Sequence, residues 1–215
     1  MHVRESQAER RARSRSALLE AAARGLSRNG YANLVLAEVA AEAGYTRGAL
    51  YHQFADKEEL ALAVVEWVGE TWTEEVEKPA DLPDPVESLL ATARGHAVYC
   101  RRDVARVMRV LHAEFGGRDH PVGQAVAAIF AELIEDCAAK IAAGRASGAL
   151  PPGPPVEVTA AAFVGAVEGV VSQVAGNAPH DVELVERAVR GVLGLPPETL
   201  IGGLLGVPAD QRRDQ

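Results

Sequence analysis

Proline clusters divide this chain into segments in which apolar residues recur at the spacing of an α-helix. The strongest breaks are PADLPDP at 79–85, PPGPP at 151–155 and Leu195–Pro197, with weaker ones at 116–121 and 176–180. Between the breaks, no segment alternates apolar and polar residues with the period of a β-strand. Alanine, the best helix former and a poor strand former, occurs 39 times. The sequence therefore predicts an all-α fold, and we find no internal repeat.

The expected helices follow from this spacing. Leu18, Ala22 and Leu26 recur every four residues in the first helix, and Asn29-Gly30 is a typical stop signal. The segments expected to be helical after it are Leu36–Ala43, Arg47–Phe54, Lys57–Lys78, 86–100, 102–115, 121–148, 156–175 and 181–193. The Gly/Pro-rich stretch Pro196–Gln215 is expected to end in a disordered tip.

Charge is distributed unevenly along the 215 residues. Residues 1–57 carry a net charge of +3 and residues 58–215 a net charge of −11, which together give −8. This asymmetry predicts a small domain (1–57) that faces a polyanion and a larger domain (58–215) that avoids one. By charge alone, a solvated N-terminal helix with a chance excess of arginine explains the same numbers.

Several classes of protein are disfavoured. Two cysteines, Cys100 and Cys137, are too few for a disulfide framework or a four-cysteine metal site. Charged residues interrupt the apolar runs, so we expect no transmembrane helix, and the N-terminus MHVRESQAERRARSR does not resemble a signal peptide. These features predict a cytoplasmic protein.

Residues 18–60 have the pattern of a helix-turn-helix unit with a supporting helix on either side. Gly44 is placed to end one short helix and Thr46 to cap the next. Val39, Ala40, Leu50 and Phe54 have the spacing to form a small core with Leu26, which leaves Arg47, Gly48, Tyr51 and His52 on the outer face. In such a unit the second helix enters the DNA major groove, although any short corner of two helices has a similar pattern.

A family resemblance favours the DNA-binding alternative. Residues 30–60 closely resemble the DNA-binding domain of the tetracycline-repressor (TetR) family. The matching pieces are Gly30-Tyr31, Val39-Ala40, Ala43-Gly44, the run from Thr46 to Tyr51, Phe54, and Lys57 to Leu60. The rest of the chain resembles the family only in length and in its helical, proline-punctuated layout.

The resemblance implies a three-helix DNA-binding domain followed by a larger helical ligand-binding and dimerisation domain. It also implies a homodimeric repressor that a small molecule releases from palindromic, double-stranded operator DNA. Thr46, Tyr51 and Lys57 match family positions that contact the DNA backbone, and Arg47, Gly48 and His52 match recognition-helix positions. A ligand-independent regulator or an activator would share this fold.

The chain departs from the family pattern before the second helix. The family often has Thr or Ser where this chain has Leu34 and Val35, and a hydroxyl there would cap the helix and bind phosphate. Asn33 is expected to cap this helix instead and is included among the DNA-binding candidates. Upstream, the cluster Arg10, Arg11, Arg13 and Arg15 is either a DNA-contacting arm or a disordered solubilising tail.

Two apolar stripes near the C-terminus predict a dimer interface. Small residues between them allow helices to approach closely, and two helices from each subunit would form a four-helix bundle. The same stripes would also suit the core of a single subunit. The residues expected at the interface are Phe163, Val167, Val170, Val174, Val185, Val189 and Val192.

A ligand pocket is expected among the central helices. Aromatic and Met side chains with a few polar groups are typical of such a lining, although ordinary core packing explains each of them alone. The candidates are Trp67, Trp72, Tyr99, Met108, His112, Phe115, Phe130 and Phe163.

The sequence gives little support for catalysis or for a metal or cofactor site. His96, His112, Glu114 and His120 lack a tight metal-ligand spacing, so we predict no metal and no cofactor. The chain has no nucleophile elbow, phosphate loop, HExxH or dinucleotide fingerprint, so an enzyme is disfavoured. A helical scaffold without DNA contact would leave the stretch GALYHQF at 48–54 unexplained.

Overall fold

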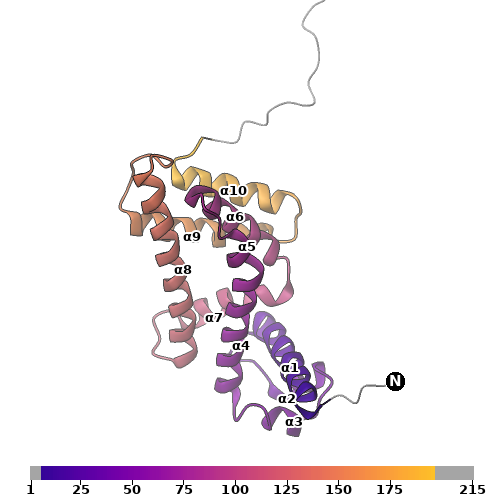
Figure 1. Cartoon of the computed structure of the whole chain (residues 1–215). Helices are drawn as coiled ribbons and strands as arrows, with labels where there is room; N and C mark the ends of the chain where they lie inside the picture. Colours follow the sequence, from indigo (N-terminus) through magenta and orange to yellow (C-terminus); the bar gives the residue numbers. More distant parts are fainter. Residues whose placement is uncertain (1–5, 197–215) are drawn as a thin grey trace, which may run out of the picture.

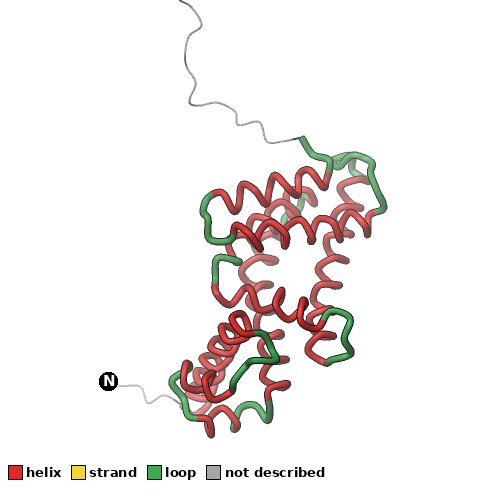
Figure 2. The backbone as a smooth tube through the Cα atoms, turned by 180° about the vertical axis from the view of Figure 1, so that it is seen from behind, coloured by secondary structure: helices red, strands yellow, loops and turns green. Residues whose placement is uncertain are grey.

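The computed structural model describes residues 6–196, and the tail beyond Pro196 lies outside the described residues. Within them the chain is helical and has no strand, which confirms the predicted fold class (Figures 1 and 2). The elements are α1 (Gln7–Asn29), α2 (Leu36–Glu42), α3 (Arg47–Tyr51), α4 (Lys57–Trp72), the π-helical turn η1 (Thr73–Glu77), α5 (Lys78–Ala80), α6 (Pro85–Tyr99), the 3₁₀ turn η2 (Asp103–Arg106), α7 (Val107–Phe115), α8 (Pro121–Ala146), α9 (Val156–Val174) and α10 (His180–Leu193).

Local capping explains where several helices start and stop. Ser6 and Glu9 form a capping box at the start of α1, and Asp56 caps α4 through the backbone N–H of Glu59. Gly30, at the end of α1, has a φ of 72°, a conformation that glycine adopts without steric cost.

The structure corrects the expected course of two segments. The segment Lys57–Lys78 is not one uniform helix, because it widens into η1 before Pro79. Proline has no backbone N–H to continue the α-helical ladder, and its ring crowds the preceding turn. The segment 102–115 begins with η2 rather than with an α-helical turn.

The N-terminal arginines also differ from expectation. Arg10, Arg11, Arg13 and Arg15 lie on the first turns of α1, so they form neither a flexible arm nor a disordered tail. Arg15 lies over the ring of Phe54 at 4.7 Å, which ties this part of α1 to the helix-turn-helix unit.

The helices are arranged in two regions joined by α4 and α8. The first three helices lie at one end in Figure 1, and α6, α9 and α10 lie at the other. One hydrophobic cluster joins α1–α3 to α4, α7 and the start of α8, so it continues well past Lys57 through Leu60, Val64 and Leu111. A second cluster fills the space between α6, α8, α9 and α10. Because the first cluster crosses residue 57, the division of the chain into a DNA-binding domain (1–57) and a regulatory domain (58–215) remains a prediction.

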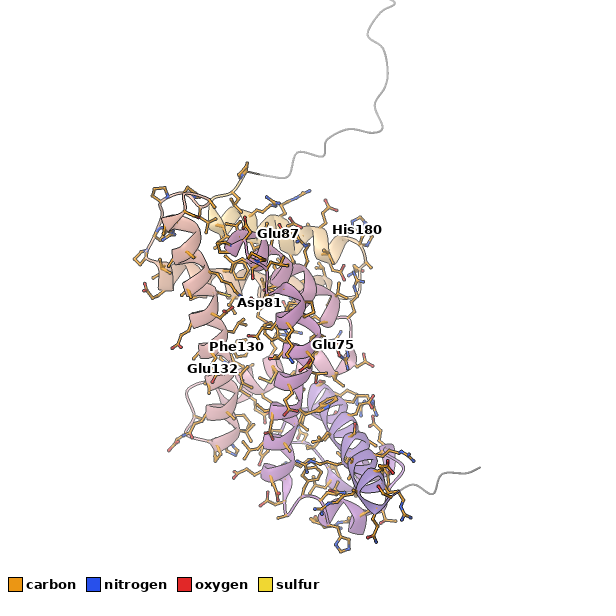
Figure 3. All side chains as sticks on the ribbon, viewed as in Figure 1. Glu75, Asp81, Glu87, Phe130, Glu132 and His180 are labelled. Atoms are coloured by element: carbon orange, nitrogen blue, oxygen red, sulfur yellow. The ribbon has the colours of Figure 1, made fainter. Side chains whose placement is uncertain are left out.

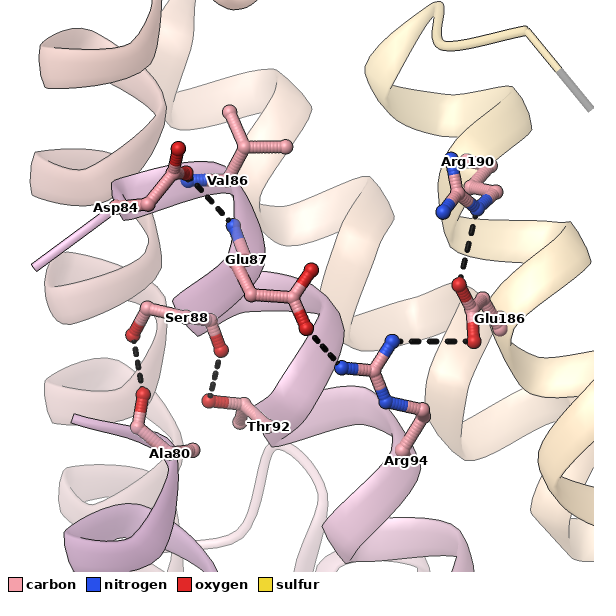
Figure 4. A network of polar contacts seen from close by, with 9 residues as sticks. All are labelled: Ala80, Asp84, Val86, Glu87, Ser88, Thr92, Arg94, Glu186 and Arg190. Carbon is pink, nitrogen blue, oxygen red and sulfur yellow. Dashed lines mark hydrogen bonds and ion pairs between the residues drawn. The ribbon is translucent and has the colours of Figure 1, made fainter. Parts of the chain in front are cut away.

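Polar contacts fasten α6 to its neighbours (Figure 4). The guanidinium of Arg94 forms an ion pair with Glu87 on the same helix and another, at 3.2 Å, with Glu186 of α10. The buried hydroxyl of Ser88 donates to the carbonyl oxygen of Ala80 at 2.6 Å, which holds α5 against α6. These contacts fix the end of the molecule away from α1–α3.

Among residues 6–196, one helix qualifies as a membrane span by length and composition, contrary to the sequence-based expectation. This is α9, whose 18-residue apolar window contains too few charged residues to exclude it. In the fold, however, α9 packs against α8 and α10, and its Phe163 and Val171 are buried in the second cluster. We therefore describe α9 as a helix of the packed fold that is buried along one side.

Candidate nucleic-acid interface and ligand cavity

The helix-turn-helix unit is built on the core that its sequence predicts. Val39, Ala40, Leu50 and Phe54 are each at most 3% exposed and pack with Leu26, which is completely buried. Between α2 and α3 the backbone turns at Gly44, with a φ of 78°. This confirms the predicted packing and fixes the orientation of α3 against α1.

The outer face of α3 carries the polar residues singled out from the sequence. Thr46 caps the helix by accepting the backbone N–H of Ala49 at 3.2 Å. Arg47, Gly48, Tyr51 and His52 are exposed. The guanidinium of Arg47 donates to the Tyr51 hydroxyl at 3.3 Å and lies over its ring at 5.4 Å. The two side chains are thus held together on the surface, with most of their donors directed to solvent.

The other two DNA-binding candidates have structural partners. Asn33 does not cap α2, because Val35 occupies the N-cap position and Asn33 Nδ2 donates to the carbonyl oxygen of Asn29. Lys57 Nζ donates to the carbonyl oxygen of Ala32 at 3.0 Å and lies 4.7 Å from the centre of the Tyr31 ring. Lys57 is at the first turn of α4, where its charge and the helix N-terminus both favour an anion.

A contact that the sequence did not indicate joins this unit to the rest of the molecule. Glu114, near the end of α7, accepts the backbone N–H of Tyr31 at 2.6 Å and that of Ala32 at 2.8 Å. Phe115 packs edge-on against the Tyr31 ring and is stacked on His120 at 4.3 Å. Residues 30–32 are therefore held by α7 through one carboxylate and one aromatic cluster. Backbone donors leave no mark in a sequence pattern, so only the structure reveals this clamp.

A cavity with a volume of about 350 Å³ lies among α4, α6, α7 and α8, and Glu168 of α9 is also in its lining. Figure 3 labels Phe130 and Glu132 on α8, which packs against α4. The residues that line it are Glu66, Val68, Gly69, Glu70, Trp72, Thr73, Glu77, His96, Tyr99, Ala105, Met108, Arg109, Ile129, Phe130, Glu132, Leu133, Asp136 and Glu168.

Half of the residues expected in a pocket line this cavity, namely Trp72, Tyr99, Met108 and Phe130. The other four do not. Trp67 packs against the first hydrophobic cluster, and Phe115 belongs to the aromatic cluster around Tyr31. His112 is exposed at the surface beside Phe130. Phe163 is buried in the second cluster and lines a smaller adjoining pocket, which shares Trp72 and His96 with this cavity. The spacing of residues along a helix does not show whether a side chain faces a cavity or packs against a neighbouring helix.

His96 is the centre of a polar network at the back of the cavity. Trp72 Nε1 donates to His96 Nδ1 at 2.9 Å, and His96 Nε2 lies 3.0 Å from Glu168 and 3.2 Å from the Cys100 sulfur. Burial lowers the pKa of His96, but the contacts with Cys100 and Glu168 outweigh burial and raise it. The hydrogen bond from Trp72 opposes this rise in the pKa of His96, because it needs an unprotonated Nδ1 as its acceptor. In either state the Nε2 proton points toward Glu168, so this carboxylate is already engaged.

The two cysteines are free and buried. Burial raises the pKa of the Cys137 thiol to about 12, which keeps it protonated near neutral pH. Among residues 6–196, no group of three His, Cys, Asp or Glu side chains could hold a metal ion.

The predicted dimer stripe is mainly a core stripe of the single subunit. Phe163, Val167, Val185 and Val189 are at most 6% exposed and belong to the second cluster, so a second subunit does not reach them. This corrects their assignment as direct interface contacts. They are buried because α9 and α10 pack against each other and against α6 along this side. Val170, Val174 and Val192 are half-buried, and their part in an interface remains a prediction.

Comparison with known proteins agrees with this geometry at the N-terminal end. The family model described as "Bacterial regulatory proteins, tetR family" matches residues 18–64. The regulator CymR of Pseudomonas putida is 44% identical over 71 residues, which is 33% of this chain and 35% of CymR. The regulator TtgR, from a strain of the same species, is 41% identical over 58 residues, 27% of this chain and 28% of TtgR. The sequence match thus spans about a third of these relatives or less.

Solved structures extend the likeness to the whole fold. AibR in complex with isovaleryl coenzyme A and operator DNA matches with a TM-score of 0.71 and 22% identity, over 84% of this chain and 98% of AibR. A TetR-like regulator from Rhodococcus sp. RHA1 matches with a TM-score of 0.69 and 24% identity, over 89% of this chain and all of the other.

The exposed face of α3 and its buried support thus define a helix-turn-helix domain of the bacterial-regulator type. The family match covers residues 18–64 of this domain, and the solved structures share the all-helical fold, so the N-terminal part of the chain is similar to the DNA-binding domain of TetR-family regulators.

Proposed function

We propose that the protein is a cytoplasmic, homodimeric transcriptional repressor that binds a palindromic operator and leaves it when a small molecule occupies the cavity. The observation that carries this proposal is the recognition face of α3. There Arg47, Gly48, Tyr51 and His52 are exposed on a helix whose orientation is fixed by Leu50 and Phe54. Polar side chains on a rigid second helix are what the major groove requires.

The charge distribution supports the same partner. Residues 1–57 have a net charge of +3 on a chain of −8. Arg10, Arg11 and Arg13 are exposed along the first turns of α1, beside the helix-turn-helix unit. Basic residues gathered around the recognition helix favour contact with phosphate, which supplies affinity without reading sequence.

We place the dimer interface on the outer side of α9 and α10. Ala161, Ala162, Gly165 and Gly169 are exposed along α9, and Leu184 of α10 is 39% exposed. A methyl group added at Gly165 or Gly169 would meet nothing in the subunit. Such a face of small residues lets two helix pairs approach closely, as in a four-helix bundle.

The cavity is a suitable place for an effector, because two helices that reach the DNA-binding end, α4 and α7, also form part of its wall. Helix α4 runs from Lys57 to the cavity wall at Trp72. Helix α7 runs from Met108 and Arg109, in the wall, to Glu114, which holds residues 30–32. AibR, a structural neighbour, was solved with both a small molecule and operator DNA.

An effector releases DNA only if it binds the DNA-incompetent state more tightly. A hundredfold preference corresponds to about 2.7 kcal/mol of coupling, which is within the usual allosteric range. Reciprocity then requires operator DNA to weaken effector binding by the same factor. Trp72 lies in the cavity wall, so its fluorescence can report occupancy with and without DNA.

A gel-shift assay with the DNA upstream of the protein's own gene tests the first part of the proposal, together with sedimentation of the free protein. We expect a dimer at micromolar concentration and a complex whose affinity falls steeply as salt is raised, because phosphate contacts release counterions. A monomer with salt-independent DNA binding would contradict the proposal. An effector that occupies the cavity without changing operator affinity would leave a ligand-independent regulator.

A further inference from the structure

The charge around the cavity restricts what it can bind. Its apolar wall includes three aromatic residues, Trp72, Tyr99 and Phe130. Six of the other lining residues are acidic, whereas Arg109 is the only lining residue among those described that carries a permanent positive charge. The acidic residues are Glu66, Glu70, Glu77, Glu132, Asp136 and Glu168. An apolar ligand body would therefore be surrounded by an excess of negative charge.

The cations close to the cavity are already paired. Arg109 lies 3.8 Å from Glu168, and His96, whose pKa is raised to about 10, lies 3.0 Å from the same carboxylate. Lys140, which is not in the lining, lies 2.5 Å from Asp136. An anionic ligand would have to take Arg109 from its carboxylate and also approach the remaining acidic groups. Like charges brought together in a partly desolvated site repel strongly, so the cavity disfavours carboxylate and phosphate ligands.

Three of the acidic residues are, in contrast, unpaired. Glu66 and Glu70 on α4 and Glu132 on α8 are exposed at the mouth and make no hydrogen bond or ion pair with the described residues. Glu66 and Glu70 are four residues apart on one helix, so they face the same side and repel each other. A positive charge placed between α4 and α8 would relieve this repulsion and gain attraction from all three carboxylates.

The aromatic wall suits the same kind of ligand. The faces of Trp and Tyr rings attract an organic cation, and their apolar area binds its hydrocarbon body. A bare metal ion is a poor candidate, because no group of three ligating side chains among the described residues could hold one. The combination of aromatic walls and unpaired carboxylates indicates an organic ligand with a single delocalised or quaternary positive charge.

We propose that this cavity binds amphiphilic organic cations, with the apolar body between Trp72 and Phe130 and the positive charge directed toward Glu70 and Glu132. This inference rests on the proposed role of the cavity as the effector site and specifies the chemical class of the effector. It concerns residues beyond 64, outside the segment that the family model matches.

Two probes of nearly the same shape and opposite charge test the proposal directly. Tetraphenylphosphonium is a lipophilic cation, and tetraphenylborate is its anionic counterpart. Titration of the full-length protein, without DNA and followed by calorimetry and tryptophan fluorescence, should show at least tenfold tighter binding of the cation. Because the carboxylates lie at the mouth, this preference should shrink as salt is raised. Equal or tighter binding of the borate, or no binding of the phosphonium, would overturn the proposal.

Single substitutions test where the positive charge of the bound ligand lies. Glu70→Gln and Glu132→Gln keep the size of the side chain and remove one unpaired carboxylate each, so each should weaken phosphonium binding about two- to fivefold. Glu135→Gln is the matched control, because Glu135 is exposed on the same helix but does not line the cavity. Loss of affinity in the control alone, or in none of the variants, would place the cation elsewhere and contradict the proposal.

The same probe separates this inference from the proposed function. If tetraphenylphosphonium binds in the cavity and operator affinity does not change, the ligand class stands and the effector role fails. If operator DNA is released by an anionic or neutral molecule in the cavity while the phosphonium does not bind, the effector role stands and the ligand class fails.

Discussion

The carboxylate of Glu114 accepts the backbone N–H of Tyr31 at 2.6 Å, across 83 positions of sequence. Its second oxygen accepts the N–H of Ala32 at 2.8 Å. These donors lie between α1 and α2, where no helix satisfies them. A hydrogen bond to an ionised acceptor is roughly twice as strong as a neutral one, so this contact fastens the helix-turn-helix unit to α7.

We therefore predict that Glu114→Gln loosens the loop at residues 30–32 without disrupting the fold. The amide has one acceptor oxygen, so one of the two N–H groups loses its partner and meets an NH₂ donor instead. The free energy of unfolding should fall by about 1–3 kcal/mol. Hydrogen exchange of the Tyr31 and Ala32 amides should accelerate, as measured by NMR. Glu135→Gln, on the exposed side of α8, is the control and should change neither quantity.

The core of the helix-turn-helix unit could be predicted from the sequence because its determinants are local. The spacing of Val39, Leu50 and Phe54 defines one face, and the turn residue Gly44 fixes the angle between the helices. The cap at Thr46 was likewise predicted and is confirmed. Asn33 was predicted wrongly, because its amide donates to the end of α1 instead of accepting at the start of α2.

The cavity and the contacts between distant helices could not be predicted in the same way. Phe163 and Phe130 look alike in sequence, yet Phe163 is buried in the second cluster beside a smaller pocket and Phe130 lines the 350 Å³ cavity. The difference depends on how α8 and α9 pack, which helical periodicity does not specify. The same limit applies to Val167 and Val189, whose spacing suits an intersubunit stripe and a core stripe equally well.

Gly48 offers a test that separates DNA binding from stability. A methyl group added at this position would meet only the Thr46 hydroxyl oxygen, at 3.8 Å, so the free protein has room for it. Alanine is the better helix former by roughly 0.5–1 kcal/mol, so Gly48→Ala should preserve or slightly raise the thermal unfolding temperature. If the backbone of α3 approaches DNA closely, operator affinity should fall at the same time. Unchanged operator affinity would show that this position does not face the DNA.

Lys57 and Arg47 are expected to contribute in different ways. Lys57→Ala should weaken binding to operator and to random DNA alike, because a phosphate contact carries no sequence information. Arg47→Ala should relax base preference and cost about 1–3 kcal/mol if the side chain reaches a guanine. Fluorescence anisotropy with operator and scrambled duplexes distinguishes the two effects.

The control for Lys57→Ala is Lys78→Ala, which removes an exposed cation that pairs with Glu74 far from α3. Lys57 also donates to the Ala32 carbonyl, so its variant must be shown by circular dichroism to remain folded. Random-DNA affinity that is equal in both variants would contradict the phosphate role of Lys57.

The last prediction concerns Arg101 and Asp181, which join α6 to α10. Two nitrogens of Arg101 donate to the two carboxylate oxygens of Asp181, each at 2.8 Å, and the Asp181 side chain is completely buried. The guanidinium, together with the backbone N–H of Val182, lowers the pKa of Asp181 to about 2 against the opposing effect of burial. Arg101→Ala should therefore lower the free energy of unfolding at pH 7, because it leaves a buried charge with only backbone donors. Lys78→Ala, which breaks a pair open to water, should cost less than about 1 kcal/mol.

The pH dependence of the wild type follows from the direction of that shift. An Asp whose pKa is lower in the folded protein than in the unfolded chain stabilises the fold above the unfolded value, which is about 4. This stabilisation, on the order of 2 kcal/mol, is lost as the pH falls from about 4 toward 2. Urea unfolding at a series of pH values should show the wild type losing stability in this range more steeply than Arg101→Ala, which has little of this contribution to lose. Parallel acid profiles for the two proteins would show that the ion pair between α6 and α10 does not stabilise the fold.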